Sequence, residues 1–110
     1  MRVKKFTQAI INCHKLIKLN PNISYLYNLC GMAYQGNNQI EKSIESFNLA
    51  LHYDPENLAA MNNLANSYKA LNHNDKAEEI YKKILKKDPK NIKCLNNLAN
   101  LMKKLRDFNS

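Results

Sequence analysis

The sequence predicts an all-α protein in which pairs of antiparallel helices stack along one axis, and an internal repeat is the basis of this prediction. Prolines stand at positions 21, 55 and 89, so each is 34 residues from the next. When the chain is shifted by the same step, similar side chains superpose, and Tyr34 aligns with Tyr68. Self-similarity at a period of roughly 20 to 50 residues is typical of repeat proteins, whose units bury their apolar faces against their neighbours.

The spacing of apolar residues and the place of each proline divide the chain into about six helices. Near the start, Phe6, Ile10, Cys13 and Ile17 are three or four residues apart, which is the spacing of one helix face. Proline cannot continue a helix and favours an extended residue before it, so each proline separates two helices. The predicted helices span residues 3–19, 24–36, 40–53, 58–71, 75–87 and 92–105.

Small residues and asparagines recur where two helices of a pair meet or turn. Gly31 aligns with Ala65, and a small side chain at this place permits the close approach of two helices. Asn38 and Asn72 fall in the short links between paired helices. Asparagine tolerates the left-handed backbone conformation that commonly follows a helix, so we expect this conformation at both residues.

Eight positions of this pattern recur in two complete units. The first unit has Tyr27, Cys30, Gly31, Tyr34, Ser43, Phe47, Ala50 and Pro55. The second unit has Met61, Leu64, Ala65, Tyr68, Ala77, Tyr81, Ile84 and Pro89. The sequence therefore resembles the tetratricopeptide repeat (TPR) family, whose pattern is a large residue, Leu, Gly or Ala, Tyr, Ala, an aromatic residue, Ala and Pro. The resemblance covers essentially the whole chain and implies a right-handed superhelix of antiparallel helix pairs.

The repeat register predicts one array in residues 1–110. It consists of a half-unit in residues 1–23 (a second helix), complete units in 24–57 and 58–91, and a half-unit in 92–110 (a first helix). An array that starts and stops within a unit is expected to be a piece of a longer protein, and the alternative is a small domain whose end helices cap it. Terminal repeats need a polar outer face, so an uncovered last helix favours self-association, end to end or by exchange of a terminal helix. The apolar residues expected to be uncovered are Leu95, Leu98, Leu101, Met102 and Leu105.

The resemblance also implies where a ligand would bind, because in TPR arrays the first helix of each pair usually lines a concave groove. These helices are residues 24–36, 58–71 and 92–105. The side chains that their core does not require are mostly asparagine and lysine. The residues expected to contact a peptide are Asn28, Asn62, Asn63, Asn66, Lys69, Lys93, Asn97, Asn100 and Lys104.

The block Asn-Asn-Leu-Ala-Asn occurs at 62–66 and again at 96–100. It is similar to the repeats of O-linked N-acetylglucosamine transferases, in which a ladder of asparagines grips an extended peptide. A carboxamide donates and accepts hydrogen bonds, so it can hold a peptide unit without reading its side chain. Asn63 and Asn97 occupy the ladder position, whereas Leu29 stands there in the first complete unit, so the ladder is short. The alternative is that these asparagines are only solvated or bridge neighbouring helices.

A second binding mode of the family is the carboxylate clamp, which grips the acidic C-terminus of a chaperone. It needs Lys and Asn in one unit, Asn in the next, and Lys and Arg in the third. Asn63 and Lys93 fit this pattern, but Asn28, Met32 and Asn97 do not. A complete clamp is therefore not expected.

The charge of the chain bears on its partner. Lys and Arg number 17 against 9 Asp and Glu, a net charge of +8, and the excess lies towards the two ends. A basic surface favours acidic partners, so we predict a protein-interaction scaffold that binds an extended, acidic peptide. One alternative is a TPR region that presents substrates to the catalytic domain of a transferase. Another is a basic helical repeat that binds nucleic acid, which is disfavoured because the middle of the groove has few charges.

No catalytic, cofactor or metal site is expected, so the chain itself is predicted not to be an enzyme. The only glycines, Gly31 and Gly36, form no phosphate-binding loop, and the three cysteines have no C-x-x-C spacing. Cys13 and Cys30 occupy core positions, and Cys94 is expected to be the more accessible thiol. Free thiols indicate a reducing compartment, the cytoplasm. No apolar run approaches the roughly 18 residues that span a bilayer.

Overall fold

The structure is a computed structural model that describes residues 2–109, so the outermost residue of each predicted half-unit lies outside it. Its six α-helices are α1 (Arg2–Leu19), α2 (Ser24–Gly36), α3 (Ile40–Tyr53), α4 (Leu58–Ala70), α5 (Asn74–Lys87) and α6 (Ile92–Asn109). The predicted bounds agree within one residue except at the end of α6. That helix continues about one turn beyond residue 105 because no proline or glycine follows to end it.

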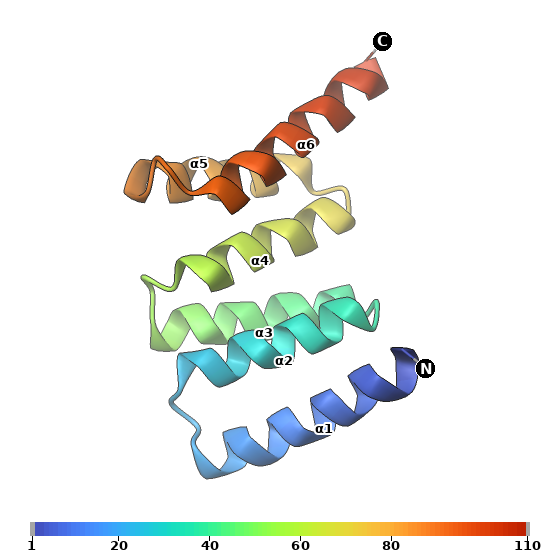
Figure 1. The fold of residues 1–110 in the computed structure, drawn as a ribbon, viewed down its shortest axis with the longest axis vertical. Coiled ribbons are helices and arrows are strands. Elements are labelled where there is room, and N and C mark those ends of the chain that lie inside the picture. Colours follow the sequence, from blue (N-terminus) through green and yellow to red (C-terminus); the bar gives the residue numbers. More distant parts are fainter. Residues whose placement is uncertain (1, 110) are drawn as a thin grey trace.

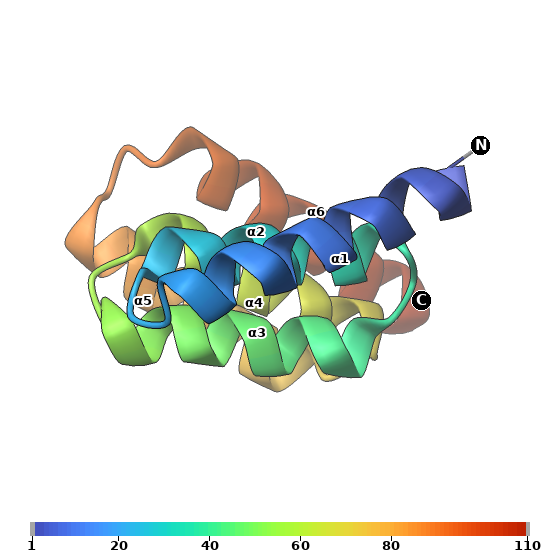
Figure 2. The same ribbon diagram turned by 90° about the horizontal axis from the view of Figure 1, so that it is seen from below.

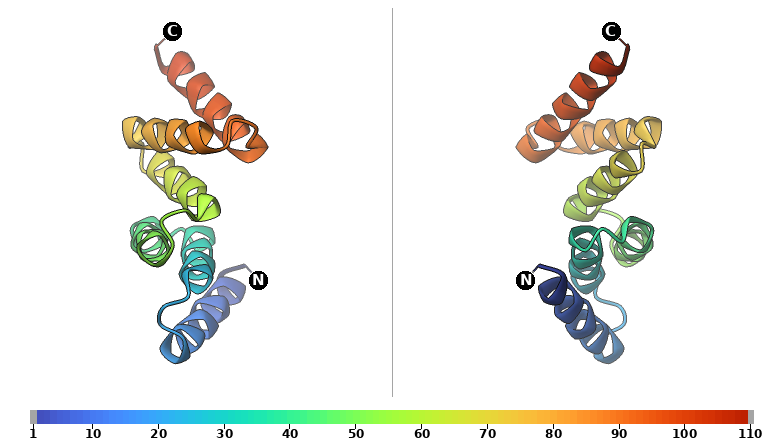
Figure 3. Two further views of the ribbon diagram at one scale, coloured as in Figure 1. Left: turned by 90° about the vertical axis from the view of Figure 1, so that its left-hand side faces the viewer. Right: turned by 90° about the vertical axis from the view of Figure 1, so that its right-hand side faces the viewer.

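The helices form one stack that is 47 Å long, with α1 and α6 at its two extremities (Figures 1 and 3). Figure 2 looks along this stack, so successive helices are seen one behind another. The pairs α2–α3 and α4–α5 share the most extensive contacts, and α1 and α6 pack on α2 and α5. The first helices α2, α4 and α6 also contact one another in succession. These three helices therefore lie together along one side of the stack, which is the arrangement that the sequence predicts.

The two helices of the α2–α3 pair approach each other closely at Gly31. A Cβ atom added there would lie 2.5 Å from the ring of Phe47, which is fully buried. Ala65 takes the same place in the next pair and is also fully buried, as is Tyr81 opposite it in the pattern. The prediction that small residues at this position permit close helix packing is confirmed.

Asparagines lie at helix ends in two different roles. Asn38 and Asn72 both have φ of 63°, as expected for the left-handed conformation that follows the first helix of each pair. Asn57 and Asn91 cap α4 and α6, each accepting a hydrogen bond through Oδ1 from the backbone N–H three residues later, at 3.1 and 3.0 Å. Ile23 occupies the N-cap position before α2, but its side chain has no polar atom that could cap the helix. These caps were not predicted from the sequence.

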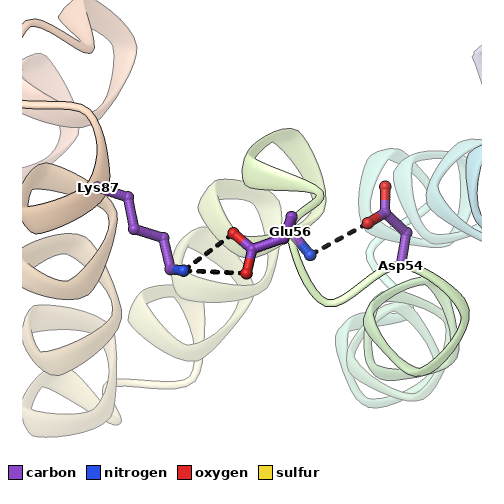
Figure 4. Close-up of polar contacts among 3 residues, drawn as sticks. All are labelled: Asp54, Glu56 and Lys87. Carbon is purple, nitrogen blue, oxygen red and sulfur yellow. Dashed lines mark hydrogen bonds and ion pairs between the residues drawn. The ribbon is translucent and has the colours of Figure 1, made fainter.

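The loop between α3 and α4 is tied to the following unit by an ion pair. The backbone N–H of Glu56 donates to Asp54 Oδ1 at 3.1 Å. The Glu56 carboxylate in turn accepts from Lys87 Nζ, at the end of α5, at 2.9 and 3.1 Å (Figure 4). This exposed contact joins residues 31 positions apart, in the loop before α4 and at the end of α5.

A cluster of buried core residues joins α4, α5 and α6. Its buried members are Met61, Ala65, Ala77, Tyr81, Ile84, Cys94 and Leu101. The prediction that Cys94 is the accessible thiol is wrong, because its side chain is fully buried. Its Sγ–H donates to the backbone carbonyl of Tyr81 at 3.2 Å, so α6 begins against the middle of α5.

The apolar face of α6 is covered more than its sequence predicts. Leu101, expected to be uncovered, is fully buried because it lies seven residues after Cys94 and faces α5 with it. Leu98 and Leu105 are partly buried against the same cluster. Only Leu95 and Met102 of the predicted set are exposed, at 44% and 38% of their surface.

Candidate peptide-binding face

Two pairs of asparagines join the first helices of successive units. Asn63 on α4 donates from Nδ2 to Oδ1 of Asn28 on α2, at 3.0 Å. Asn97 on α6 donates in the same way to Asn62 on α4, at 3.1 Å. Asn28 and Asn62 are buried, with 7% and 6% of their surface exposed, whereas Asn63 and Asn97 are half-buried. In each pair the buried asparagine therefore supports the other asparagine, whose side chain reaches the surface.

This pairing orients Asn63 and Asn97. Each uses one N–H of its amide for the supporting bond, which leaves the other N–H and Oδ1 for a ligand. A buried amide that loses its hydrogen-bond partner costs about 1–3 kcal/mol. Both asparagine–asparagine bonds are therefore favoured to stay formed. The sequence predicts direct ligand contact for Asn28 and Asn62. In the structure both side chains are buried, and each accepts a hydrogen bond from the asparagine of the neighbouring unit.

A chain of polar contacts lies behind Asn63 and locks α2, α3 and α4 together. Gln35 Nε2 donates to the Ser67 hydroxyl at 2.8 Å and to the Asn63 backbone carbonyl at 3.2 Å. The Ser67 hydroxyl is 2.8 Å from that of Ser43, which donates to the Ile40 carbonyl at 2.6 Å. Both serines are fully buried. Sequence reasoning missed this network, although serine at 43, where the family pattern has alanine, was its one visible signal.

Asn66 lies one turn beyond Asn62 on the same face of α4 and is half-buried. Its Oδ1 accepts a hydrogen bond from the hydroxyl of Tyr81 on α5. Burial raises the pKa of Tyr81 to about 12, so this hydroxyl remains a donor at neutral pH. Asn66 is thereby fixed by the second helix of its own unit rather than by the neighbouring unit.

Lysines of α4 and α6 lie on the face that these two helices form with α2. Lys104 on α6 donates from Nζ to Oδ1 of Asn72 at 2.7 Å and to the backbone carbonyl of Lys69 at 3.4 Å. Lys69 is half-buried, and its burial, followed by the nearby charge of Lys104, lowers its pKa. An open hollow of about 530 Å³ lies beside Lys104. It is lined by Asn100, Lys103, Lys104 and Asp107.

The face changes character from one end to the other. On α2, Tyr25 and Met32 are 63% and 47% exposed and flank the buried Asn28. On α6, Lys93 and Asn100 are exposed, three or four residues from Asn97 on its face of the helix. The face is therefore apolar along α2, carries amides along α4, and is basic along α6.

The cysteines are poorly suited to chemistry. Cys13, Cys30 and Cys94 are free and buried. Burial raises the pKa of the Cys30 thiol to about 11 and also raises those of Cys13 and Cys94, so all three stay protonated at neutral pH. Within the described residues, no three potential metal ligands come together. No helix in this part of the chain is long and apolar enough to cross a membrane.

Comparison with known proteins identifies the family and the fold. Residues 34–105 match the family model of the tetratricopeptide repeat. The chain belongs to the tetratricopeptide repeat family. The match covers most of the chain, so the predicted all-α TPR fold is confirmed. No curated protein sequence matches this TPR chain.

Several solved TPR structures share the fold. The first TPR of Spaghetti (RPAP3) bound to the HSP90 peptide SRMEEVD is 21% identical, covers 94% of this chain and 82% of that one, and has a TM-score of 0.86. The Sgt2 TPR domain from Aspergillus fumigatus is 21% identical, with coverages of 96% and 72% and a TM-score of 0.86. The second TPR domain of human RPAP3, in complex with the HSP70 peptide SGPTIEEVD, is 18% identical, with coverages of 90% and 82% and a TM-score of 0.83.

Proposed function

We propose that this TPR array is a non-enzymatic protein-interaction scaffold that binds an extended peptide across α2, α4 and α6. The observation that supports it is the paired asparagines, in which buried Asn28 and Asn62 hold Asn63 and Asn97 at the surface. Each held amide offers one donor and one acceptor, and a peptide unit offers the complementary pair. Two RPAP3 domains of the same fold were solved with peptides bound, which is consistent with the proposal.

The charge and polarity of the face indicate the chemistry of the peptide. We expect apolar side chains against Tyr25 and Met32 on α2, and acidic side chains towards Lys69, Lys93 and Lys104. The clamp residues of the family are only partly present, so the proposal does not require a free peptide C-terminus. The free cysteines support a reducing compartment, and we propose the cytoplasm.

A peptide-display selection on the full chain tests the scaffold proposal. Peptides selected by the wild type should bind Asn63→Ala/Asn97→Ala about tenfold more weakly or worse, because each lost hydrogen bond contributes about 0.5–1.5 kcal/mol. Fluorescence anisotropy with labelled peptides measures the change, and circular dichroism confirms that the variant is folded.

The matched control is Asn22→Ala/Asn48→Ala, which removes two exposed asparagines outside the three lining helices and should bind as wild type. Unchanged affinity of folded Asn63→Ala/Asn97→Ala would contradict the role of the paired asparagines. Failure of the wild type to select any peptide would contradict the scaffold itself.

We also expect the chain to associate with a second copy of itself. Leu95 and Met102 on α6 are exposed apolar side chains on one face of the helix. Their burial against a second copy would be favourable. Sedimentation velocity over a concentration series should show association, and a single monomeric species at every concentration would contradict it.

A further inference from the structure

A second hollow, which we call the outer hollow, lies between the two complete units and away from the asparagine rungs. It has a volume of about 350 Å³. Its lining residues are Leu51 of α3, Pro55 and Glu56 of the following loop, Met61 of α4, and Lys83 and Lys87 of α5. Met61 precedes Asn63 by two positions, which is about 200° around α4, so the two side chains leave the helix on nearly opposite sides.

The same place one unit earlier is filled. When the 34-residue period is subtracted, the six lining residues correspond to Ile17, Pro21, Asn22, Tyr27, Leu49 and Tyr53. There the rings of Tyr27 and Tyr53 stack, with centroids 5.3 Å apart and an interplanar angle of 19°. The Tyr27 hydroxyl donates to the Pro21 carbonyl at 2.6 Å. The fold thus accommodates stacked tyrosine rings at this position of the repeat.

The outer hollow lacks both rings. Met61 and Lys87 stand where the preceding unit has the two tyrosines, and methionine has no hydroxyl to offer the Pro55 carbonyl. A methionine sulfur makes favourable contacts with an aromatic ring, and an ammonium group is attracted to the face of one. Both replacements therefore suit a ring that comes from another molecule.

We propose that the outer hollow binds a tyrosine side chain of a partner protein, next to an acidic residue of that partner. The ring takes the place that the stacked tyrosines fill in the preceding unit, and its hydroxyl donates to the Pro55 carbonyl as Tyr27 does to Pro21. This inference goes beyond the proposed function, because it uses none of the side chains expected to hold a peptide. It adds a second contact surface to the array.

The charge of the rim indicates the acidic neighbour. Lys83 replaces Leu49 of the preceding unit, is exposed, and makes no hydrogen bond or ion pair with the residues that the structure describes. Lys87 binds Glu56, at 2.9 and 3.1 Å (Figure 4). That pair is exposed, so it is weak and can open. A carboxylate beside the ring therefore meets Lys83, and it can exchange with Glu56 for Lys87.

A nucleotide also joins a flat ring to an anion, but it suits the outer hollow less well. Proteins that bind a nucleic-acid strand line its backbone with a positively charged groove. Here the Glu56 carboxylate lies on the rim between the ring position and the end of α5. The preceding unit, moreover, fills the same place with a phenol whose hydroxyl has a carbonyl partner.

The test is an NMR titration of the full chain, labelled with ¹⁵N and with ¹³C at the methionine methyl groups. Acetyl-Asp-Tyr-Asp-amide should move the Met61 methyl resonance upfield, because a ring stacked on a methyl group shields it. Met32 and Met102, exposed on α2 and α6, are internal controls and should not move. Acetyl-Asp-Leu-Asp-amide should bind about fivefold more weakly and give no upfield shift. Acetyl-Asp-Phe-Asp-amide, which lacks the hydroxyl, should bind about threefold more weakly.

Variants identify the groups responsible. Met61→Tyr/Lys87→Tyr restores the tyrosine pair of the preceding unit, so it should fill the hollow and abolish the probe-induced shifts of amides 83–87. Lys83→Gln should weaken binding of the acidic tyrosine probe about threefold and leave that of acetyl-Asn-Tyr-Asn-amide unchanged. Glu56→Gln should tighten binding of the acidic probe about twofold by removing a like charge. Lys86→Gln, an equal charge change on α5 outside the hollow, is the matched control and should have no effect.

Several results would overturn the tyrosine site. They are a Met61 methyl resonance that does not move at saturation, equal affinity for the tyrosine and leucine probes, and unchanged binding by Met61→Tyr/Lys87→Tyr that circular dichroism shows to be folded. If that variant does not fold, the methyl shift and Lys83→Gln decide. Tighter, Lys83-dependent binding of adenosine monophosphate would replace the tyrosine by a nucleotide.

The same titration separates this site from the proposed function. Asn63→Ala/Asn97→Ala should bind the tyrosine probe as the wild type does, even if it no longer binds selected peptides. Loss of probe binding in this variant, or a larger shift at Met32 than at Met61, would place the probe on the face of α2, α4 and α6 and overturn the outer site.

Discussion

The contact between Gly31 and Phe47 offers the most direct test of how a helix pair is held together. A Cβ at Gly31 would lie 2.5, 2.6 and 2.9 Å from three atoms of the Phe47 ring. The ring is fully buried, so it has no free space to enter. Overpacking a core costs about 1–3 kcal/mol, and three contacts this short place Gly31→Ala near the upper end. Alanine regains about 1 kcal/mol of helix propensity, so the free energy of unfolding should fall by about 2 kcal/mol.

Gly36→Ala is the matched control for this change. Its added Cβ would meet the ring of Phe6 just as closely, but Phe6 is only half-buried and can turn towards solvent. Thermal unfolding followed by circular dichroism should show a fall of roughly 8 °C for Gly31→Ala, at about 4 °C per kcal/mol, and little change for Gly36→Ala. Adding Phe47→Leu to Gly31→Ala should recover part of the loss in a double-mutant cycle. Equal melting of Gly31→Ala and wild type, or equal losses in both glycine variants, would refute the reasoning.

Three further predictions concern a helix cap, the titrating core groups and the ion pair between units. Asn57→Ala should lower the free energy of unfolding by about 1 kcal/mol, because α4 loses its N-cap; an unchanged urea midpoint would contradict this. Burial raises the pKa of Cys30 to about 11 and that of Tyr81 to about 12, so the unfolded chain ionises first and stability should fall between pH 9 and 12. Urea midpoints at pH 8 and 11 measure the fall, which Cys30→Ala should reduce. Glu56→Gln removes the exposed ion pair with Lys87 and should cost less than about 1 kcal/mol, and a larger loss in urea unfolding would show that the pair is better shielded than its exposure indicates.

The fold was predictable because each unit repeats the same local pattern and the same packing. The recurrence of Gly31 as Ala65, and of Asn38 as Asn72, placed a close contact and a turn in both units without knowledge of either neighbour. The errors fall on α6, where Cys94 proved buried. The spacing of apolar residues in a helix indicates which face is buried. It does not indicate how much of that face the preceding helix covers.

The candidate site was less accessible to sequence reasoning. The repeated asparagine block drew attention to Asn63 and Asn97, but it did not separate them from Asn28 and Asn62. That distinction depends on hydrogen bonds between residues 35 positions apart, on different helices. Similarly, no local pattern brings Lys69 and Lys104 together.

The sequence by itself determined that this protein is an all-α TPR array, because a 34-residue period and its buried positions are properties of one unit that each unit repeats. Only the tertiary structure decided which asparagines are supports and which reach the surface. The reason is that burial depends on the rotation of each helix against the next. Neighbouring positions such as Asn62 and Asn63 look alike in sequence, and the packing of α4 between α2 and α6 turns one inward and leaves the other partly exposed.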